Sequence, residues 1–175
     1  MNGWIFLISF YLLQLYNLTF VSKQMRDRIL DRSNFNRKQW FLTLIGKCFA
    51  IPAMLLMILI PITSEYIEFL LGIILFLFGM VGLRIAVSNF ITTPLDQPVT
   101  KGLYSFSRNP QETMLSIIML GIGFIVGSWI VLILVVISRI FNHFNILAQE
   151  EACIKQYGES YQEYLRTIPR YFLVF

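Results

Sequence analysis

Polar and charged side chains gather in three short stretches near the C-terminal end of an otherwise apolar chain. They are residues 101–110, the adjacent carboxylates Glu150 and Glu151, and residues 157–170. These stretches contain a glycine turn, basic side chains, a carboxylate pair and several tyrosines, which are groups that bind ligands and orient reacting molecules. Any chemistry that the chain performs is expected there.

Residues 101–110 have the features of a ligand-binding turn. Gly102 allows a tight turn or a close approach of the backbone to a ligand. Tyr104 offers a flat ring with one hydroxyl. Asn109 can cap a helix that begins at Pro110, and the backbone amides at such a helix start favour an anionic group. With Glu150 as an acceptor for hydroxyls or a partner for a cation, these groups suit a zwitterionic ligand that carries a nucleoside.

The same residues are also compatible with a purely structural role. A carboxylate pair after a membrane helix, followed by tyrosines, is typical of a tail at the membrane interface. Arg108 is also typical of the positive charges that set membrane orientation. Composition alone leaves both interpretations open.

The bulk composition indicates which elements must position these groups. Of the 175 residues, 57% are hydrophobic and 14% are charged, and the mean hydropathy is +0.67. A soluble domain carries about a quarter charged residues, and a soluble fold of this size could not bury so much apolar surface. We therefore expect an integral membrane protein.

The charge pattern predicts the orientation of that protein. The net charge is +4, and the basic residues are concentrated between Lys23 and Lys38. The positive-inside rule places this basic loop, residues 22–39, in the cytoplasm and the N-terminus outside. The sequence lacks the polar surface of interleaved arginines and aromatic rings that binds single-stranded nucleic acid, so no nucleic-acid partner is expected.

Three apolar runs form a predicted membrane anchor in residues 1–87. Each is long enough to cross the hydrocarbon core once, and they cover residues 2–21, 40–63 and 65–87. The third run carries glycines that allow close packing against a neighbouring helix, at Gly72, Gly79 and Gly82. Residues 88–109 are predicted to form a loop, because Pro94 and Pro98 prevent a continuing helix.

The apolar run that begins at Glu112 is too long for one membrane helix. Glycines near its middle and the Gly127-Ser128 pair predict a break, which gives a hairpin of two helices over residues 112–126 and 129–148. A buried hairpin turn must be satisfied by protein or lie near the interface. The alternative is a single long tilted helix. The hairpin returns the chain to the cytoplasm and would bring Arg108 and Asn109 close to Glu150.

Residues 149–170 are predicted to form a soluble amphipathic tail. Apolar and aromatic side chains recur there at three- and four-residue spacing and share a helical face, at Ile154, Tyr157, Tyr161, Tyr164, Leu165 and Ile168. Gly158 interrupts this face and is expected to end one helix and start another. The predicted fold is all-α: a single polytopic membrane domain of about five membrane-embedded helices with a helical hairpin and a cytoplasmic C-terminal amphipathic helix.

Other reactive side chains indicate no additional chemistry. Cys48 and Cys153 form no CxxC pair, so we expect two free thiols and no metal site. His143 is the single histidine, and we interpret it as a residue of the hairpin near the interface rather than as a base.

The order and spacing of the polar stretches resemble the integral-membrane methyltransferase family, which includes isoprenylcysteine carboxyl methyltransferases and phospholipid N-methyltransferases. The resemblance covers residues 94–170. It rests on Gly102-Leu103-Tyr104, Arg108-Asn109-Pro110, the Glu150 and Glu151 pair, Tyr157-Gly158 with Tyr161 and Tyr164, and Pro169-Arg170.

The resemblance implies a cytoplasmic site for S-adenosylmethionine between the hairpin and the C-terminal segment. It implies Arg108 and Glu150 as the catalytic pair nearest the reacting centre. The implied cofactor-binding residues are Lys101, Gly102, Leu103, Tyr104, Asn109, Pro110, Glu150 and Glu151. Residues 88–175 would then hold the cofactor-binding loop, the hairpin and the tail.

The sequence also departs from the family pattern. Asn109 stands where histidine is usual, Glu112 where tyrosine is usual, and Met114 where glycine is usual. The carboxylate pair can be aligned in two registers: one uses Glu150 and Glu151, and the other uses Gln149 and Glu150. Glu150 belongs to the pair in both.

The sequence therefore predicts a membrane methyltransferase that uses S-adenosylmethionine on a lipophilic acceptor, such as a prenylcysteine carboxylate or a phospholipid amine, drawn from the surrounding lipid. The alternative is a non-catalytic assembly or scaffold protein that retains the fold, which the departures at Asn109, Glu112 and Met114 favour. A transporter is a third possibility. The first three spans argue against it, because they carry no intramembrane carboxylate of the kind that ion pathways use.

Overall fold

The computed structural model describes residues 2–23 and 36–172. Within them the fold is helical, without an extended strand. The elements are α1 (Trp4–Thr19), α3 (Arg37–Leu59), α4 (Tyr66–Ile91), the short 3-10 helix η1 (Gly102–Ser105), α5 (Pro110–Val126), α6 (Trp129–Tyr157) and α7 (Glu159–Thr167). The all-α prediction is confirmed. Arg26, Arg28 and Arg32 of the predicted basic loop lie outside the described residues.

The outer surface of the helices is apolar. Leu12, Leu59 and Ile67 each expose more than half of their surface, and many other large apolar side chains also point outward. By length and composition α3, α4 and α6 can each cross a bilayer, and α1 and α5 are shorter apolar helices. Because such a surface is stable only in lipid, the protein is an integral membrane protein.

Local signals in the sequence account for the helix starts. The Asn36 side chain accepts a hydrogen bond from the backbone N–H of Gln39, whose own side chain accepts one from the backbone of Asn36, and this capping box starts α3. Pro110 is the first residue of α5, as predicted. The Ser128 hydroxyl accepts a hydrogen bond from the N–H of Val131 and starts α6.

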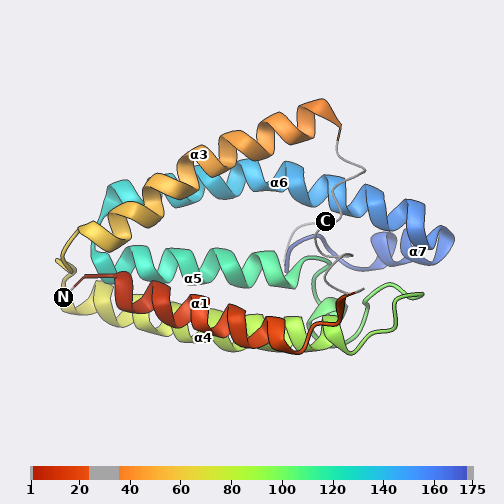
Figure 1. Cartoon of the computed structure of the whole chain (residues 1–175), viewed down its shortest axis with the longest axis horizontal. Coiled ribbons are helices and arrows are strands. Elements are labelled where there is room, and N and C mark those ends of the chain that lie inside the picture. Colours follow the sequence, from red (N-terminus) through yellow and green to blue (C-terminus); the bar gives the residue numbers. More distant parts are fainter. Residues whose placement is uncertain (1, 24–35, 173–175) are drawn as a thin grey trace.

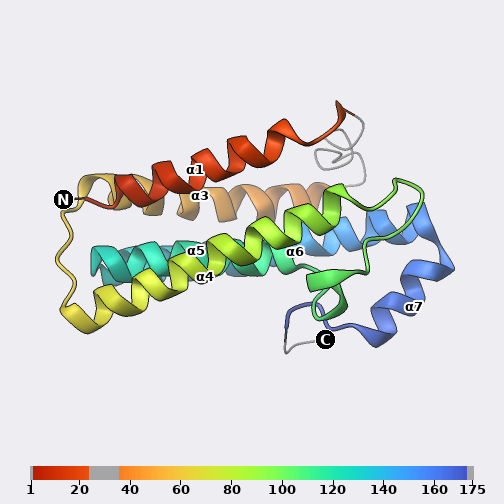
Figure 2. The same cartoon turned by 90° about the horizontal axis from the view of Figure 1, so that it is seen from below.

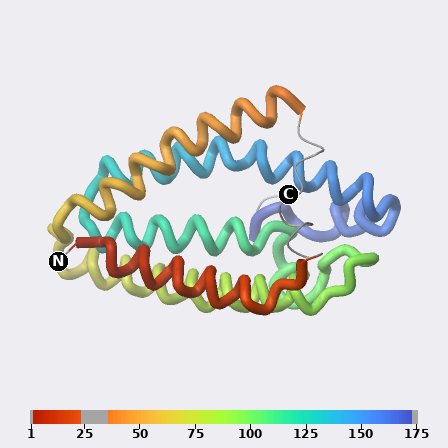
Figure 3. The backbone as a smooth tube through the Cα atoms, viewed as in Figure 1, coloured from red at the N-terminus to blue at the C-terminus, as the bar shows by residue number. Residues whose placement is uncertain are grey.

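The helices run back and forth between two ends of one bundle (Figure 3). α4 packs mainly on α5, and α3 packs mainly on α6 (Figures 1 and 2). α4 and α5 approach closely because glycines face one another: a Cβ atom on Gly72 would lie 2.8 Å from the carbonyl oxygen of Gly121, and one on Gly79 would lie 3.1 Å from the backbone nitrogen of Ile118. The predicted packing role of these glycines is confirmed.

The predicted hairpin is confirmed in α5 and α6. Gly127 ends α5 in the left-handed conformation, with φ of 71°. The hydroxyls of Thr63 and Ser64 donate to the carbonyl oxygens of Val126 and Ile125, at 3.2 and 2.8 Å. The turn is therefore satisfied by protein, as a turn at the end of a membrane bundle requires.

The C-terminal boundary of the hairpin differs from the prediction. α6 continues beyond Ala148 to Tyr157, so the first part of the predicted soluble tail extends the second hairpin helix. Gly158, with φ of 59°, separates α6 from α7 as expected. The reason is physical: a helix does not end where hydrophobicity ends, and α6 stops only at a residue that can leave the helical conformation.

The elements that carry the polar stretches meet at one end of the bundle. The end of α4, the start of α5, the end of α6 and the whole of α7 lie opposite the end that holds the N-terminus and the hairpin turn (Figures 1 and 2). Segments that are far apart in the sequence therefore share one region.

Candidate active site

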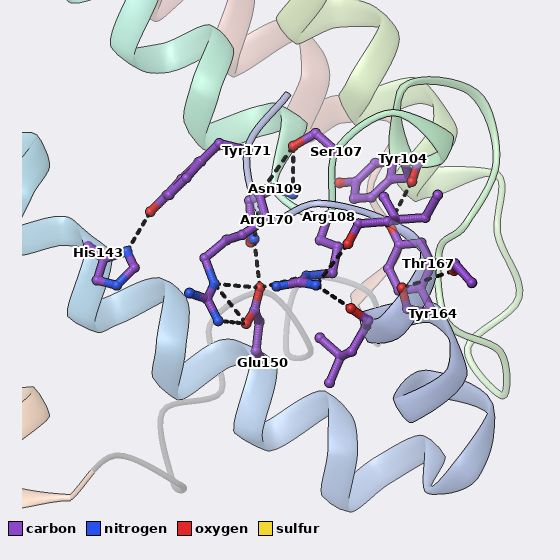
Figure 4. A network of polar contacts seen from close by, with 12 residues as sticks. Tyr104, Ser107, Arg108, Asn109, His143, Glu150, Tyr164, Thr167, Arg170 and Tyr171 are labelled. Atoms are coloured by element: carbon purple, nitrogen blue, oxygen red, sulfur yellow. Dashed lines mark hydrogen bonds and ion pairs between the residues drawn. The ribbon is translucent and has the colours of Figure 1, made fainter. Parts of the chain in front are cut away.

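The carboxylate of Glu150 is the centre of a polar network at this end of the bundle (Figure 4). Its Oε1 accepts hydrogen bonds from Arg108 Nε at 3.1 Å, Asn109 Nδ2 at 3.1 Å and Arg170 Nε at 3.2 Å. Its Oε2 accepts from Arg170 Nε at 3.0 Å and from the terminal nitrogen of the same guanidinium at 2.9 Å. The predicted proximity of Arg108 and Asn109 to Glu150 is confirmed.

Arg108 ties the loop before α5 to the C-terminal segment. One terminal nitrogen of its guanidinium donates to the carbonyl oxygens of Leu165 and Ile168, at 2.7 and 2.8 Å. Its backbone N–H donates to the carbonyl oxygen of Pro169 at 2.9 Å. The ion pair with Glu150 is almost fully buried, with side-chain exposures of 5% and 6%. Burial of two charges is costly unless each is paired and hydrogen-bonded, and here both conditions hold.

The segment after α7 closes the network from a third direction. The Ser107 hydroxyl donates to the carbonyl oxygen of Arg170 at 3.0 Å and accepts from the backbone N–H of Asn109 at 3.2 Å. The hydrogen bonds to Glu150 raise the pKa of the Arg170 guanidinium, so it stays charged. Two guanidinium groups thus face one carboxylate, which leaves one positive charge in excess.

Asn109 lies beside Glu150 as predicted, but the predicted capping hydrogen bond of its side chain is absent. It occupies the N-cap position of α5, but its side chain makes no capping hydrogen bond. The side-chain amide donates instead to Glu150 and, at 3.4 Å, to the carbonyl oxygen of Arg170. Because an amide replaces the usual histidine of the family pattern, the position keeps a hydrogen-bond donor without a titratable proton.

The Gly102 turn packs against protein. Gly102 has φ of 62°, and a Cβ atom there would lie 2.0 Å from Asn89 Nδ2 on α4. This geometry satisfies the tight-turn part of the expectation. The turn sets η1, in which Tyr104 is buried.

A tyrosine hydrogen bond connects η1 to α7. The Tyr164 hydroxyl donates to the carbonyl oxygen of Tyr104 at 2.6 Å, and the Tyr104 hydroxyl accepts from Gln111 Nε2 at 2.8 Å. Burial raises the pKa of both Tyr161 and Tyr164 above the ordinary tyrosine value. Both phenols are therefore neutral hydrogen-bonding groups at physiological pH.

The implied cofactor residues Glu151, Lys101 and Leu103 contribute no side chain to the network. Glu151 is exposed and accepts a hydrogen bond from Gln39 Nε2 of α3 at 3.2 Å. Lys101 is exposed and donates to the carbonyl oxygen of Thr92 at 2.9 Å. Leu103 is half-buried in η1 and offers no polar side-chain group. Of the two carboxylates, the structure brings only Glu150 to Arg108.

Sequence reasoning missed Arg170 and Tyr171 as site residues. Arg170 stood in the Pro169-Arg170 motif, and this was the one signal that could have placed it in the site. Tyr171 contacts His143, whose Nδ1 lies 2.8 Å from the tyrosine hydroxyl (Figure 4). His143 belongs to the part of α6 beside the site, so it lies in the hairpin as expected and adjoins the network.

The comparisons with known proteins identify a family for much of the chain. A family model described as phospholipid methyltransferase matches residues 66–160, which is more than half of the chain. The match includes Arg108, Asn109 and Glu150 and ends before Arg170. No curated protein and no solved structure matches the chain.

Proposed function

The chain belongs to the phospholipid methyltransferase family, and from this premise we propose that it transfers the methyl group of S-adenosylmethionine to a lipophilic acceptor within the membrane. The observation that carries the proposal is the convergence of Arg108, Glu150 and Arg170 at one end of the helix bundle. Two of these three residues lie in the matched segment.

The excess positive charge of the network fits the cofactor. S-adenosylmethionine carries a carboxylate, and a guanidinium fork binds a carboxylate through two parallel hydrogen bonds. We assign Arg108 and Arg170 to this carboxylate, with Glu150 as the positioning residue that holds both guanidinium groups. Gly102, Tyr104, Asn109 and Pro110 would form the adjoining wall.

When bound, S-adenosylmethionine supplies a methyl group on a sulfonium. Transfer of that group is an in-line displacement, for which orientation of the two reactants matters more than acid–base groups. A carboxylate acceptor attacks without losing a proton, whereas an amine acceptor must be neutral. The buried, hydrogen-bonded network supports such a role because rigid groups orient a ligand at little entropic cost.

The acceptor is proposed to be lipophilic because the site belongs to a bundle whose outer surface is apolar. Such a molecule would share the bilayer with the protein and reach the site laterally. The positive-inside rule supports a cytoplasmic position for the site, because the end of α1 and the start of α3, with Arg37 and Lys38, lie at the same end of the bundle as the network (Figure 1).

Cofactor binding in detergent tests the proposal. Wild-type protein is expected to bind S-adenosylmethionine. Glu150→Gln is expected to lose most of that affinity, because a neutral amide cannot hold both Arg108 and Arg170 in position. Glu151→Gln is the matched control, since Glu151 faces α3 and should leave affinity unchanged. Absence of binding by the wild-type protein, or equal loss in both variants, would contradict the proposal.

A non-catalytic scaffold remains the second candidate, and one observation favours it: protein donors already surround both oxygens of Glu150. Transfer of a labelled methyl group from S-adenosylmethionine into a total lipid extract separates the two functions. The methyltransferase yields a labelled lipophilic product that Glu150→Gln reduces. A scaffold yields none.

A further inference from the structure

A second polar cluster joins α5 to α6 inside the bundle. Glu112, in the first turn of α5, forms an ion pair with Arg139 of α6, and side-chain exposures are 24% and 21%. Asn142 Nδ2 donates to the same carboxylate oxygen of Glu112 at 2.9 Å. Charged residues in membrane helices are costly and are typical of functional positions.

An apolar cavity lies beside the cluster. Its volume is about 200 Å³, it is partly open to the surroundings, and residues of α1, α3, α5 and α6 line it. Phe10, Ala53, Met57, Met119 and Val135 form much of its wall. Whole ligands of drug size occupy roughly 300–1,000 Å³, so this cavity fits one slender apolar chain rather than a bulky molecule.

Arg139 is the charged side chain in the wall of the cavity. In the described part of the chain, the hydrogen bond of its guanidinium goes to Glu112 through one terminal nitrogen. A guanidinium has five N–H donors, so donors remain for a ligand. An apolar cavity with a cation in its wall fits an amphiphile whose chain fills the cavity and whose oxyanion pairs with the cation.

Among the lining residues on α6, Arg139 is the one nearest in the helix to the candidate active site, about 16 Å along the axis before Glu150. Arg139, His143 and Glu150 follow one another on α6 at spacings that keep them on one helical face. Tyr171 contacts His143 and directly follows Arg170, which pairs with Glu150. An oxyanion held by Arg139 would therefore lie at the end of the cavity that is nearer to the Glu150 network.

We propose that this cavity binds the apolar chain of the methyl acceptor and that Arg139 binds an oxyanion of the same molecule, either a phosphate or a carboxylate. The identification of this molecule as the methyl acceptor rests on the proposed methyltransferase function. The binding of an anionic single-chain amphiphile is independent of that function, and it can be measured without any turnover.

The experiment measures binding of three radiolabelled amphiphiles with the same chain length to purified protein in detergent: a lysophospholipid with a phosphate head, a fatty acid, and the neutral fatty alcohol. The wild-type protein is expected to bind at least one anion about tenfold or more tightly than the alcohol, since a hydrogen-bonded charge pair has this magnitude. Preference for the phosphate or for the carboxylate identifies the oxyanion. No preference for either anion over the alcohol overturns the proposal.

Four variants locate the site. Arg139→Gln is expected to remove the preference for the anion, and Glu112→Gln is expected to strengthen it, because the guanidinium loses its competing carboxylate. Ala50→Leu, which narrows the cavity, should weaken the binding of all three amphiphiles. Arg84→Gln is the matched control. Arg84 lies on α4 over the rings of Tyr16 and Phe20, outside the cavity wall, so its substitution should leave the affinities for all three amphiphiles unchanged. Thermal unfolding verifies that each variant is folded.

Two further outcomes keep this inference separate from the proposed function. If Arg139→Gln keeps the anion preference while the wild-type protein binds S-adenosylmethionine, the cavity assignment is wrong and the methyltransferase proposal stands. If the wild-type protein binds the anion through Arg139 but does not bind S-adenosylmethionine, the cavity assignment stands and the methyltransferase proposal is wrong. With an active enzyme, Arg139→Gln should raise the KM for the acceptor and leave the affinity for the cofactor unchanged; a lowered kcat with an unchanged KM contradicts the acceptor assignment.

Discussion

At the scale of single residues, Glu150 holds three segments of the chain together. Arg108, Asn109 and Arg170 all donate to one carboxylate, and each comes from a region distant from Glu150 in the sequence. A buried ion pair contributes little net stability, because desolvation offsets the attraction. Its value here lies in geometry: the carboxylate determines where two guanidinium groups point.

Substitution of Arg108 and substitution of Arg170 are expected to destabilise the fold to different extents. Arg108→Gln should cost about 3–5 kcal/mol, because it leaves a buried carboxylate short of its charged partner. Arg170→Gln should cost about 1.5–3 kcal/mol, the range for a hydrogen bond to a charged group, since its side chain is 23% exposed. Thermal unfolding in detergent measures both. Arg166→Gln, at an exposed position of α7, is the control and should be neutral.

The buried tyrosines predict a loss of stability in alkali. Because burial raises the pKa of Tyr164 in the folded protein, the neutral phenol is favoured by folding. Its contribution is complete below the unfolded value of about 10 and is lost as pH rises above it. Tyr164→Phe should therefore reduce the fall in melting temperature above about pH 10, at the cost of about 1 kcal/mol at neutral pH for the hydrogen bond to Tyr104. An equal alkaline fall in Tyr164→Phe and in the exposed control Tyr66→Phe would contradict this.

At the scale of elements, α4 and α5 pack so closely that two glycines meet. A Cβ atom on Gly121 would lie 2.7 Å from the backbone nitrogen of Phe76, whereas one on Gly123 would meet the flexible end of Leu132 at the same distance. Backbone cannot move aside as a side chain can. On α5, therefore, the side that faces α4 does not tolerate added volume, whereas the side that faces Leu132 of α6 does.

This difference predicts opposite outcomes for two neighbouring substitutions. Gly121→Ala is expected to cost about 1–3 kcal/mol through overpacking. Gly123→Ala should be near neutral, because Leu132 can move and alanine gains up to about 1 kcal/mol in helix propensity. Melting temperatures of the two variants provide the comparison, and a Gly121→Ala variant as stable as Gly123→Ala would refute the close contact.

Most of the elements could be predicted because residues at or next to their ends determine where they begin and end. Hydropathy located the helices to within a few residues, Pro110 predicted the start of α5, and Gly127 with Ser128 predicted the hairpin turn. The end of α6 was placed too early because the polar residues after Ala148 were read as the end of the helix.

The site was predictable only where sequence order implied proximity. A hairpin brings its ends together, so the contact of Arg108 with Glu150 followed from topology. The contact of Arg170 depends on the direction in which the chain turns after Gly158, and the pair of Glu112 and Arg139 depends on the rotation of α6 about its axis. Neither quantity is encoded by spacing along the chain.

At the scale of the whole molecule, the two ends of the bundle differ in chemistry. One end holds the hairpin turn and the isolated contact of Asn2 with Pro61, and the other holds the Glu150 network with η1 and α7 (Figures 1 and 4). The proposed orientation makes the second end cytoplasmic.

Labelling with a membrane-impermeant thiol reagent tests this orientation in a background without Cys48 and Cys153. Tyr66→Cys, at an exposed position on the first end, should react in intact cells. Gln162→Cys, at an exposed position of α7, should react only after the membrane is permeabilised. The opposite pattern would invert the proposed topology.

The shortness of α1 and α5 has a consequence for the surrounding lipid. At 1.5 Å per residue, their 16 and 17 residues span about 24 and 26 Å, less than the hydrocarbon thickness of about 30 Å. The longer α3 and α4 can tilt, but short helices force the bilayer to thin around them. The protein should therefore melt at a higher temperature in bilayers of shorter-chain lipids, and stability that rises steadily with chain length would contradict this. Local thinning would lower the headgroups of one leaflet toward the level of Arg139, so that the membrane itself would deliver the polar end of a lipid to the cavity.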